Sequence, residues 1–212
     1  MKKTQMIPLL ISMLFLISCN KDEMADLNGK QSQFGEVGNE LLIRAGQVGI
    51  TDADVYVSKL ENGISTFTCS GSTSNSKYIE LIKMIPSELF PGTIDITGKT
   101  VRATINVKIT DNGSQLIFND GSKLNIVKYD AKVGDKYTTK VGKYTLENEV
   151  VEKSTEDDYM WGGMYIKIIK VKSKSVIPGV SYVEHVYNHK FGFVGLSIHF
   201  EDGSVKYVGI EC

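Results

Sequence analysis

The chain has 212 residues, with 24 lysines and arginines against 25 aspartates and glutamates, and a formal net charge of −1 at pH 7. This length is sufficient for one generous domain or two small ones. The densest basic stretch, residues 167–174, interleaves lysines with β-branched residues, which is typical of the wet face of a strand. The charge pattern therefore argues against nucleic acid as a partner.

The first 18 residues have the three parts of a bacterial export signal. Lys2 and Lys3 form the positive segment, Met6 to Ile17 form the apolar segment, and Ser18 is a small residue before a cut. The apolar segment is about 12 residues long, whereas a membrane-spanning helix needs about 20. We therefore expect residues 1–18 to be a signal peptide that is removed.

The end of this segment, Leu16-Ile17-Ser18-Cys19, resembles the lipobox of bacterial lipoproteins. The resemblance implies that Cys19 is acylated with diacylglycerol and becomes the N-terminus after cleavage. One acyl chain binds a membrane only marginally, at about 0.8 kcal/mol per buried methylene, but two or three chains anchor a protein firmly. A membrane, reached through this lipid, is thus an expected partner.

The residues after the cysteine, Asn20-Lys21-Asp22-Glu23, resemble the acidic signal that directs Bacteroidetes lipoproteins to the outer face of the outer membrane. With the lipobox, the chain is similar to the β-rich outer-membrane and surface lipoproteins of that group, which have no defined catalytic motif. The resemblance implies a lipid-anchored position at the outer membrane, on the cell surface or alternatively facing the periplasm.

The next segment, residues 19–35, is polar and acidic and has almost no β-branched residues. Such a composition buries too little apolar surface to become ordered, so we expect a flexible tether. No internal repeat or linker divides the remainder, and we expect residues 36–212 to form one β-rich globular domain.

The clearest strand is Val101 to Thr110, where odd positions are apolar and even positions are polar. Asp111-Asn112-Gly113 and Asn119-Asp120-Gly121 are tight-turn sequences that link it to strands at 115–118 and 123–129. These segments predict an antiparallel meander. A third hairpin joins 196–200 to 205–210, and further strands are expected at 41–44, 55–59, 65–69, 136–140, 144–151, 164–171 and 182–187.

One stretch has a helical period instead. Tyr78, Leu81, Ile82 and Ile85 are spaced i, i+3, i+4 and i+7, and Pro86 follows. The expected fold class is therefore all-β, an antiparallel sandwich or half-barrel with meander hairpins and one short helix near 75–85.

Lipidation of Cys19 would leave Cys69 and Cys212 as an even pair in a compartment where disulfides persist. They form either a disulfide that ties down the last residue or two unpaired thiols. No Cys-x-x-Cys sequence occurs, so the cysteines do not suggest a zinc or thioredoxin-like site.

The three histidines do not predict a metal site. His185 and His189 lie in a β-branched and aromatic context, and on a strand their spacing of about 13 Å is too large for one ion. His199 alternates with apolar neighbours and is expected to face solvent or another strand. We expect no metal, no cofactor and, without a nucleophile motif, no catalytic residues.

The most unusual local composition surrounds the only tryptophan. Tyr159, Trp161 and Tyr165 flank two glycines, and aromatic rings on a loop are stacking platforms for ligands or anchors for partners. The alternative is that Trp161 packs against one end of the fold.

Three functions agree with these features. The first is a non-catalytic surface module that binds or adheres to glycan or protein. The second is a lipid-binding or structural accessory lipoprotein of an outer-membrane complex, for which an open concave sheet lined by valine and isoleucine would be the sign. The third is a hydrolase with an unrecognised site.

Overall fold

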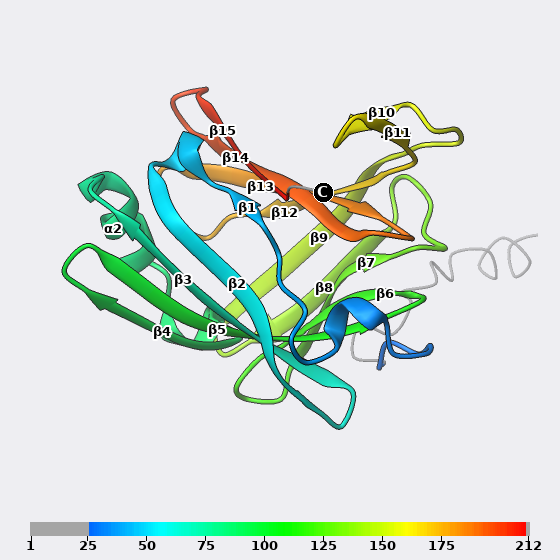
Figure 1. Cartoon of the computed structure of the whole chain (residues 1–212), viewed down its shortest axis with the longest axis horizontal. Coiled ribbons are helices and arrows are strands. Elements are labelled where there is room, and N and C mark those ends of the chain that lie inside the picture. Colours follow the sequence, from blue (N-terminus) through cyan, green and yellow to red (C-terminus); the bar gives the residue numbers. More distant parts are fainter. Residues whose placement is uncertain (1–25, 211–212) are drawn as a thin grey trace, which may run out of the picture.

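The structure, a computed structural model, describes residues 26–210, which form two antiparallel sheets facing each other (Figure 1). Sheet 1 has the order β2-β3-β5-β6-β7, and β4 pairs with the first half of β5. Its strands are β2 (Ile50–Glu61), β3 (Ile64–Thr73), β4 (Gly92–Thr97), β5 (Thr100–Thr110), β6 (Gly113–Ile117) and β7 (Lys123–Lys128).

Sheet 2 has the order β1-β15-β14-β13-β12-β9-β8, and a separate hairpin of β10 and β11 lies outside it. Its strands are β1 (Ile43–Arg44), β8 (Lys136–Val141), β9 (Tyr144–Lys153), β12 (Ile169–Lys174), β13 (Val180–Asn188), β14 (Gly192–Phe200) and β15 (Val205–Ile210). The hairpin strands are β10 (Tyr159–Trp161) and β11 (Met164–Ile166).

The all-β class, the meander hairpins and the short helix are confirmed. Helix α2 (Ser76–Lys83) begins where the Asn75 side chain accepts a hydrogen bond from the Lys77 N–H at 3.1 Å, as an N-cap does. The remaining helical elements are the 3₁₀ turns η1 (Gln33–Gly35), η2 (Gly46–Val48) and η3 (Ser87–Leu89). In the described part of the chain, no helix has the length and apolar character needed to span a membrane.

The alternation predicted for residues 101–110 sets the orientation of β5. Val107 and Ile109 are buried between the sheets, whereas Arg102 on the other face is exposed. Gly113 then begins β6 with φ +149°, and a Cβ there would lie 2.1 Å from the Val127 carbonyl oxygen. Only glycine fits this close approach between β6 and β7.

The two sheets are connected at both edges. At one edge, the segment before β1 pairs with β2, as the Leu41 N–H donates to the Val55 carbonyl at 2.7 Å, and β1 itself pairs with β15. At the other edge, β7 lies beside β8 and β9, and the Asn148 side chain donates to the Asn125 carbonyl at 2.9 Å. The sheets therefore surround a common interior.

The buried apolar residues of that interior form four clusters. The partly buried Leu116 packs against three of them and connects them. Three clusters lie between or beside the sheets, around Val171, Phe67 and Phe118. The fourth, around Val194, lies between sheet 2 and the β10–β11 hairpin.

The prediction of a flexible tether is wrong for its described part, residues 26–35. Leu27 is only 3% exposed, and the Ser32 N–H donates to the Ile109 carbonyl at 3.0 Å. The Asp26 carboxylate lies 2.6 Å from Lys123 Nζ, which lowers the pKa of that carboxyl. One apolar side chain and pairing to the β5–β6 turn thus order a segment whose composition is polar. The signal peptide 1–18 and residues 19–25 lie outside the described residues.

The structure has two strands that were not predicted, and it has two strands where one long strand was expected. β4 and β10 were missed, and the expected strand at 164–171 is divided into β11 and β12. The chain leaves the hairpin at Lys167, whose carbonyl accepts a hydrogen bond from Asn188 at 2.6 Å, before it enters sheet 2. Both sides of the break have apolar side chains, so local pattern does not reveal it.

Candidate ligand-binding cavity

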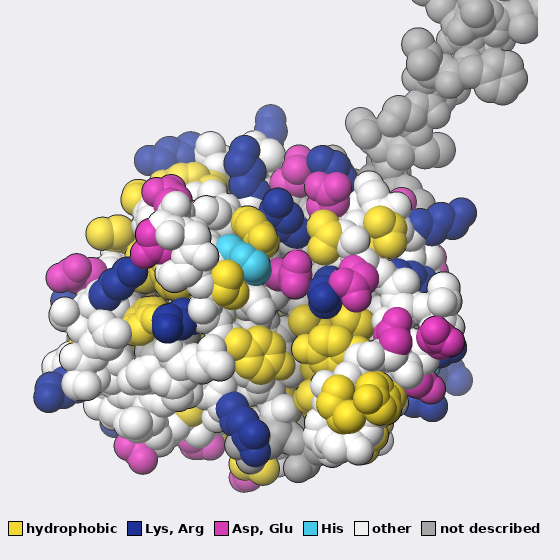
Figure 2. Space-filling view, turned by 90° about the horizontal axis from the view of Figure 1, so that it is seen from above, with side chains coloured by type: hydrophobic (Ala, Val, Ile, Leu, Met, Phe, Trp, Pro, Cys, Tyr) yellow, Lys and Arg dark blue, Asp and Glu magenta, His cyan; other side chains and the backbone are white. Residues whose placement is uncertain are grey.

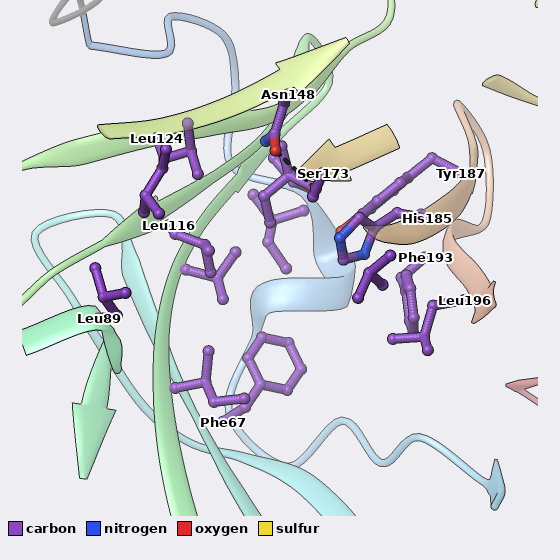
Figure 3. Close-up of a pocket in the computed structure, with 18 of the residues that line it drawn as sticks. Phe67, Leu89, Leu116, Leu124, Asn148, Ser173, His185, Tyr187, Phe193 and Leu196 are labelled. Atoms are coloured by element: carbon purple, nitrogen blue, oxygen red, sulfur yellow. Dashed lines mark hydrogen bonds between the residues drawn. The ribbon is translucent and has the colours of Figure 1, made fainter. Parts of the chain in front are cut away.

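A cavity of about 500 Å³ lies between the two sheets, among the clusters of the interior. Its walls are mainly apolar, and Figure 3 shows side chains from both sheets directed into it. Sheet 1 contributes Phe67, Ile105 and Leu116, and sheet 2 contributes Leu146, Phe193 and Leu196. The cavity is partly open to solvent, since the exposed Lys174 lies on its wall, and it is much larger than the voids of a packed interior.

The inward positions of the strands explain the open space. On β12, the inward residues change from Ile169 and Val171, which are buried in a packed cluster, to Ser173, which lines the cavity. Cys69 on β3 and Ser114 on β6 are further small residues on the cavity wall. Small side chains in these positions leave room that isoleucine or leucine would fill.

One end of the cavity is bordered by elements outside the sheets. Ile85 after helix α2 and Leu89 in η3 reach its wall, as do Val176 and Ile177 in the loop between β12 and β13. Helix α2 has no buried residue. This end of the cavity is therefore lined by partly exposed side chains, whereas another part of the wall belongs to the buried, packed cluster around Val171.

Three polar side chains lie together on the wall of sheet 2: Asn148, Ser173 and His185 (Figure 3). The Ser173 hydroxyl donates to Asn148 Oδ1 at 2.7 Å, and the Asn148 amide donates to the Asn125 carbonyl at 2.9 Å. The Ser173 hydroxyl hydrogen and one of the two amide hydrogens of Asn148 are thus already used within the protein.

His185 has a different environment. It pairs with Val171 on β12 and Leu196 on β14, and its imidazole points into the cavity (Figure 3). Burial lowers the pKa of His185 from 6.5 to about 4, because the charged form loses its hydration. The imidazole is therefore neutral at pH 7, with one donor and one acceptor nitrogen facing the cavity.

Cys69 also lines the cavity and forms no disulfide with another described residue. Burial, and secondarily the charge of Asp54, raises its pKa to about 11, so the reactive thiolate is scarce at neutral pH. Its predicted partner Cys212, like the lipidation residue Cys19, lies outside the described residues, and both the bridge and the lipidation stay predictions.

The structure brings Tyr159, Trp161 and Tyr165 onto one hairpin but not onto one face. Cross-strand partners share a face, and the pairs here are Tyr159 with Ile166 and Met160 with Tyr165. Tyr159 and Trp161 pack against the cluster on the outside of sheet 2, where Ile166 is 4% exposed. Tyr165, in contrast, is 60% exposed.

Trp161 has specific partners within the fold. Its ring lies 5.1 Å from the Phe191 ring, and its indole N–H donates to the Ile210 carbonyl at 3.0 Å. These contacts agree with the packing alternative for Trp161. A role in ligand binding for the three aromatic residues stays a prediction, and the exposed face available for it is that of Met160 and Tyr165.

The other two histidines lie away from the cavity. His189 is exposed in the turn after β13, and His199 stacks on Tyr182 with ring centroids 4.1 Å apart. Among residues 26–210, no group of three or more metal-ligating side chains lies within reach of one ion.

The cavity and His185 were missed by sequence reasoning. A signal for His185 exists in the sequence, since His185 lies two residues from both Val183 and Tyr187 on β13, and all three line the cavity.

Compared with protein-family models, curated proteins and solved structures, the chain matches none of them.

Proposed function

We propose that this chain is a lipid-anchored envelope lipoprotein whose β-rich domain binds an apolar small molecule between its two sheets. The observation that carries the proposal is the cavity, because binding sites for small molecules are typically concave, mostly apolar and about 300–1,000 Å³ in volume. The proposal favours the lipid-binding alternative over surface adhesion. The binding role requires no chemical step.

The proposal gives a role to the space that the buried clusters leave between the sheets. A cavity lined by leucine and phenylalanine forgoes the dispersion contacts that closer packing would provide. A ligand that fills this space would replace those contacts and stabilise the fold by mass action. The lipid anchor would keep such a binding protein beside the membrane, where apolar molecules are concentrated.

The test uses membranes that contain the full chain and a photoreactive hydrocarbon with an alkyne tag. After irradiation, we expect the label on peptides of β3, β5, β6, β13 and β14, which line the cavity. The variant Leu196→Trp places an indole in the cavity and should abolish this labelling. Leu42→Trp is the matched control, because Leu42 is 62% exposed. Equal labelling of both variants, or label confined to the surface, would refute the proposal.

A second candidate is a surface interaction with protein or glycan through the β10–β11 hairpin. Met160 and Tyr165 share one face and are 55% and 60% exposed, and apolar side chains gather at this side of the molecule (Figure 2). Exposed apolar patches often mark interaction sites. Tyr165→Ser should weaken binding in a glycan array or pull-down if this candidate holds, and Val205→Ser, also exposed, is its control.

The outer-membrane position and the anchor are part of the proposal and rest on the lipobox-like sequence. Mass spectrometry of the native N-terminus should find Cys19 with diacylglycerol attached. Protease treatment of intact cells then separates the cell surface from the periplasmic face, since only a surface domain is cleaved.

A further inference from the structure

We propose that the cavity takes an uncharged amphiphile whose hydroxyl or carbonyl end hydrogen-bonds to the imidazole of His185. This inference rests on the proposed binding function and adds the chemical class of the ligand.

The polar groups of the cavity wall lie on one side of it. His185 and Ser173 lie on this side together with the apolar Phe193 and Leu196, whereas Leu89 and Leu116 lie across from them (Figure 3). Val176 and Ile177 in the β12–β13 loop add further apolar side chains to the cavity wall. A ligand that is apolar throughout would leave the His185 nitrogens without a hydrogen-bond partner, whereas an amphiphile would provide one and also contact the apolar walls.

His185 is a cavity-lining group with unused hydrogen-bonding capacity on both ring nitrogens. Ser173 and Asn148 already donate to protein acceptors at 2.7 and 2.9 Å. In the described part of the chain, His185 has neither a hydrogen bond nor an ion pair with another residue. A polar group that faces an apolar cavity without a partner is available to a ligand. A ligand end group that both donates and accepts would provide the missing partner.

The surroundings favour an end group without charge. Two charged side chains reach the cavity wall, Glu147 and Lys174. The Glu147 carboxylate lies 3.3 Å from Lys136 Nζ, and Lys174 is exposed. A carboxylate or ammonium beside the neutral His185 would lose its hydration without gaining a buried counter-charge. A fatty acid held by Lys174 is the competing arrangement.

The experiment uses the full chain in membranes and the photoreactive hydrocarbon described above, with three competitors of equal chain length: dodecanol, dodecanoate and dodecylamine. Only the end group differs among them. We expect dodecanol to compete about tenfold better than either charged form, a ratio that corresponds to 1.4 kcal/mol. Dodecanoate competing as well as dodecanol would overturn the inference and favour Lys174.

Substitutions then assign the preference to His185. His185→Leu removes both ring nitrogens and should reduce the advantage of dodecanol about fivefold, while the hydrocarbon still labels the cavity and so reports a folded protein. His185→Gln retains a donor and an acceptor and should retain the advantage. His199→Leu is the matched control, because His199 stacks on Tyr182 outside the cavity.

The possible failures are distinguishable. If His185→Leu leaves the dodecanol advantage intact, the inference is wrong and the proposed binding function stands. If the hydrocarbon fails to label cavity peptides in the unsubstituted chain, the proposed function is wrong, and the inference fails with it.

Discussion

Lowering the pH from 7 to 5 should destabilise the ligand-free protein through His185, and His185→Leu should remove that part of the pH dependence. The pKa of His185 is about 4 in the folded chain and 6.5 when the side chain is solvated. Between these two values the unfolded state takes up a proton and the folded state does not. Stability is therefore lost as the pH falls below 6.5.

The magnitude follows from the two pKa values. Their difference corresponds to about 3 kcal/mol at 1.36 kcal/mol per pKa unit, of which about 2 kcal/mol is lost between pH 7 and pH 5. A loss of this size is a large fraction of the 5–15 kcal/mol that is typical of domain stability.

The assay is urea unfolding of the unlipidated Cys19→Ser chain at pH 7, 6 and 5, with and without His185→Leu. Carboxyls such as Asp26 and Asp202, whose pKa values are lowered, also lose stabilisation as the pH falls, but both proteins share them. The difference between the two pH profiles therefore isolates His185. Parallel profiles would refute the conclusion that its imidazole is buried and neutral.

Three further predictions concern packing, backbone geometry and reactivity. Leu196→Ala should lower the free energy of unfolding by less than Ile168→Ala, for which a loss of about 2–5 kcal/mol is expected. The reason is that Leu196 already borders the cavity, whereas Ile168 is 2% exposed. Chemical denaturation measures both losses, and equal losses would argue against the cavity. Gly113→Ala should lower the melting temperature, because its Cβ would meet the Val127 carbonyl oxygen at 2.1 Å, whereas Gly121→Ala, with φ +84° but no atom within 4 Å, should lower it less. In the chain with Cys19→Ser and Cys212→Ser, Cys69 should react with a maleimide at pH 7.5 far more slowly than a solvated cysteine, since the pKa of Cys69 is about 11. Dodecanol should slow the reaction of Cys69 further. A rapid reaction would contradict the burial of this thiol.

Much of the fold was predictable because its signals are local. The alternation in residues 101–110 and the turn sequences after it depend on neighbouring residues in the chain, and β5, β6 and β7 form as these signals predict. The same holds for helix α2, which begins at the Asn75 cap. Residues 26–35 escaped prediction because their order comes from contacts with β5 and β6, which are distant in sequence.

The aromatic cluster shows the limit of composition as evidence of a site. Tyr159, Trp161 and Tyr165 are conspicuous in the sequence, yet pairing on a hairpin directs Tyr165 away from the other two. Only the position of the hairpin over sheet 2 brings Trp161 to Phe191 and to the last strand.

The sequence by itself determined the all-β class, the main hairpins and the expectation of a lipid-anchored N-terminus. The tertiary structure alone decided that the interior contains a cavity and that His185 faces it. Parity along β13 reveals which face of the strand His185 occupies, but not what lies opposite. Whether a buried face meets a neighbour or empty space depends on the summed volumes of side chains from both sheets, and that sum is set by the packing of distant segments.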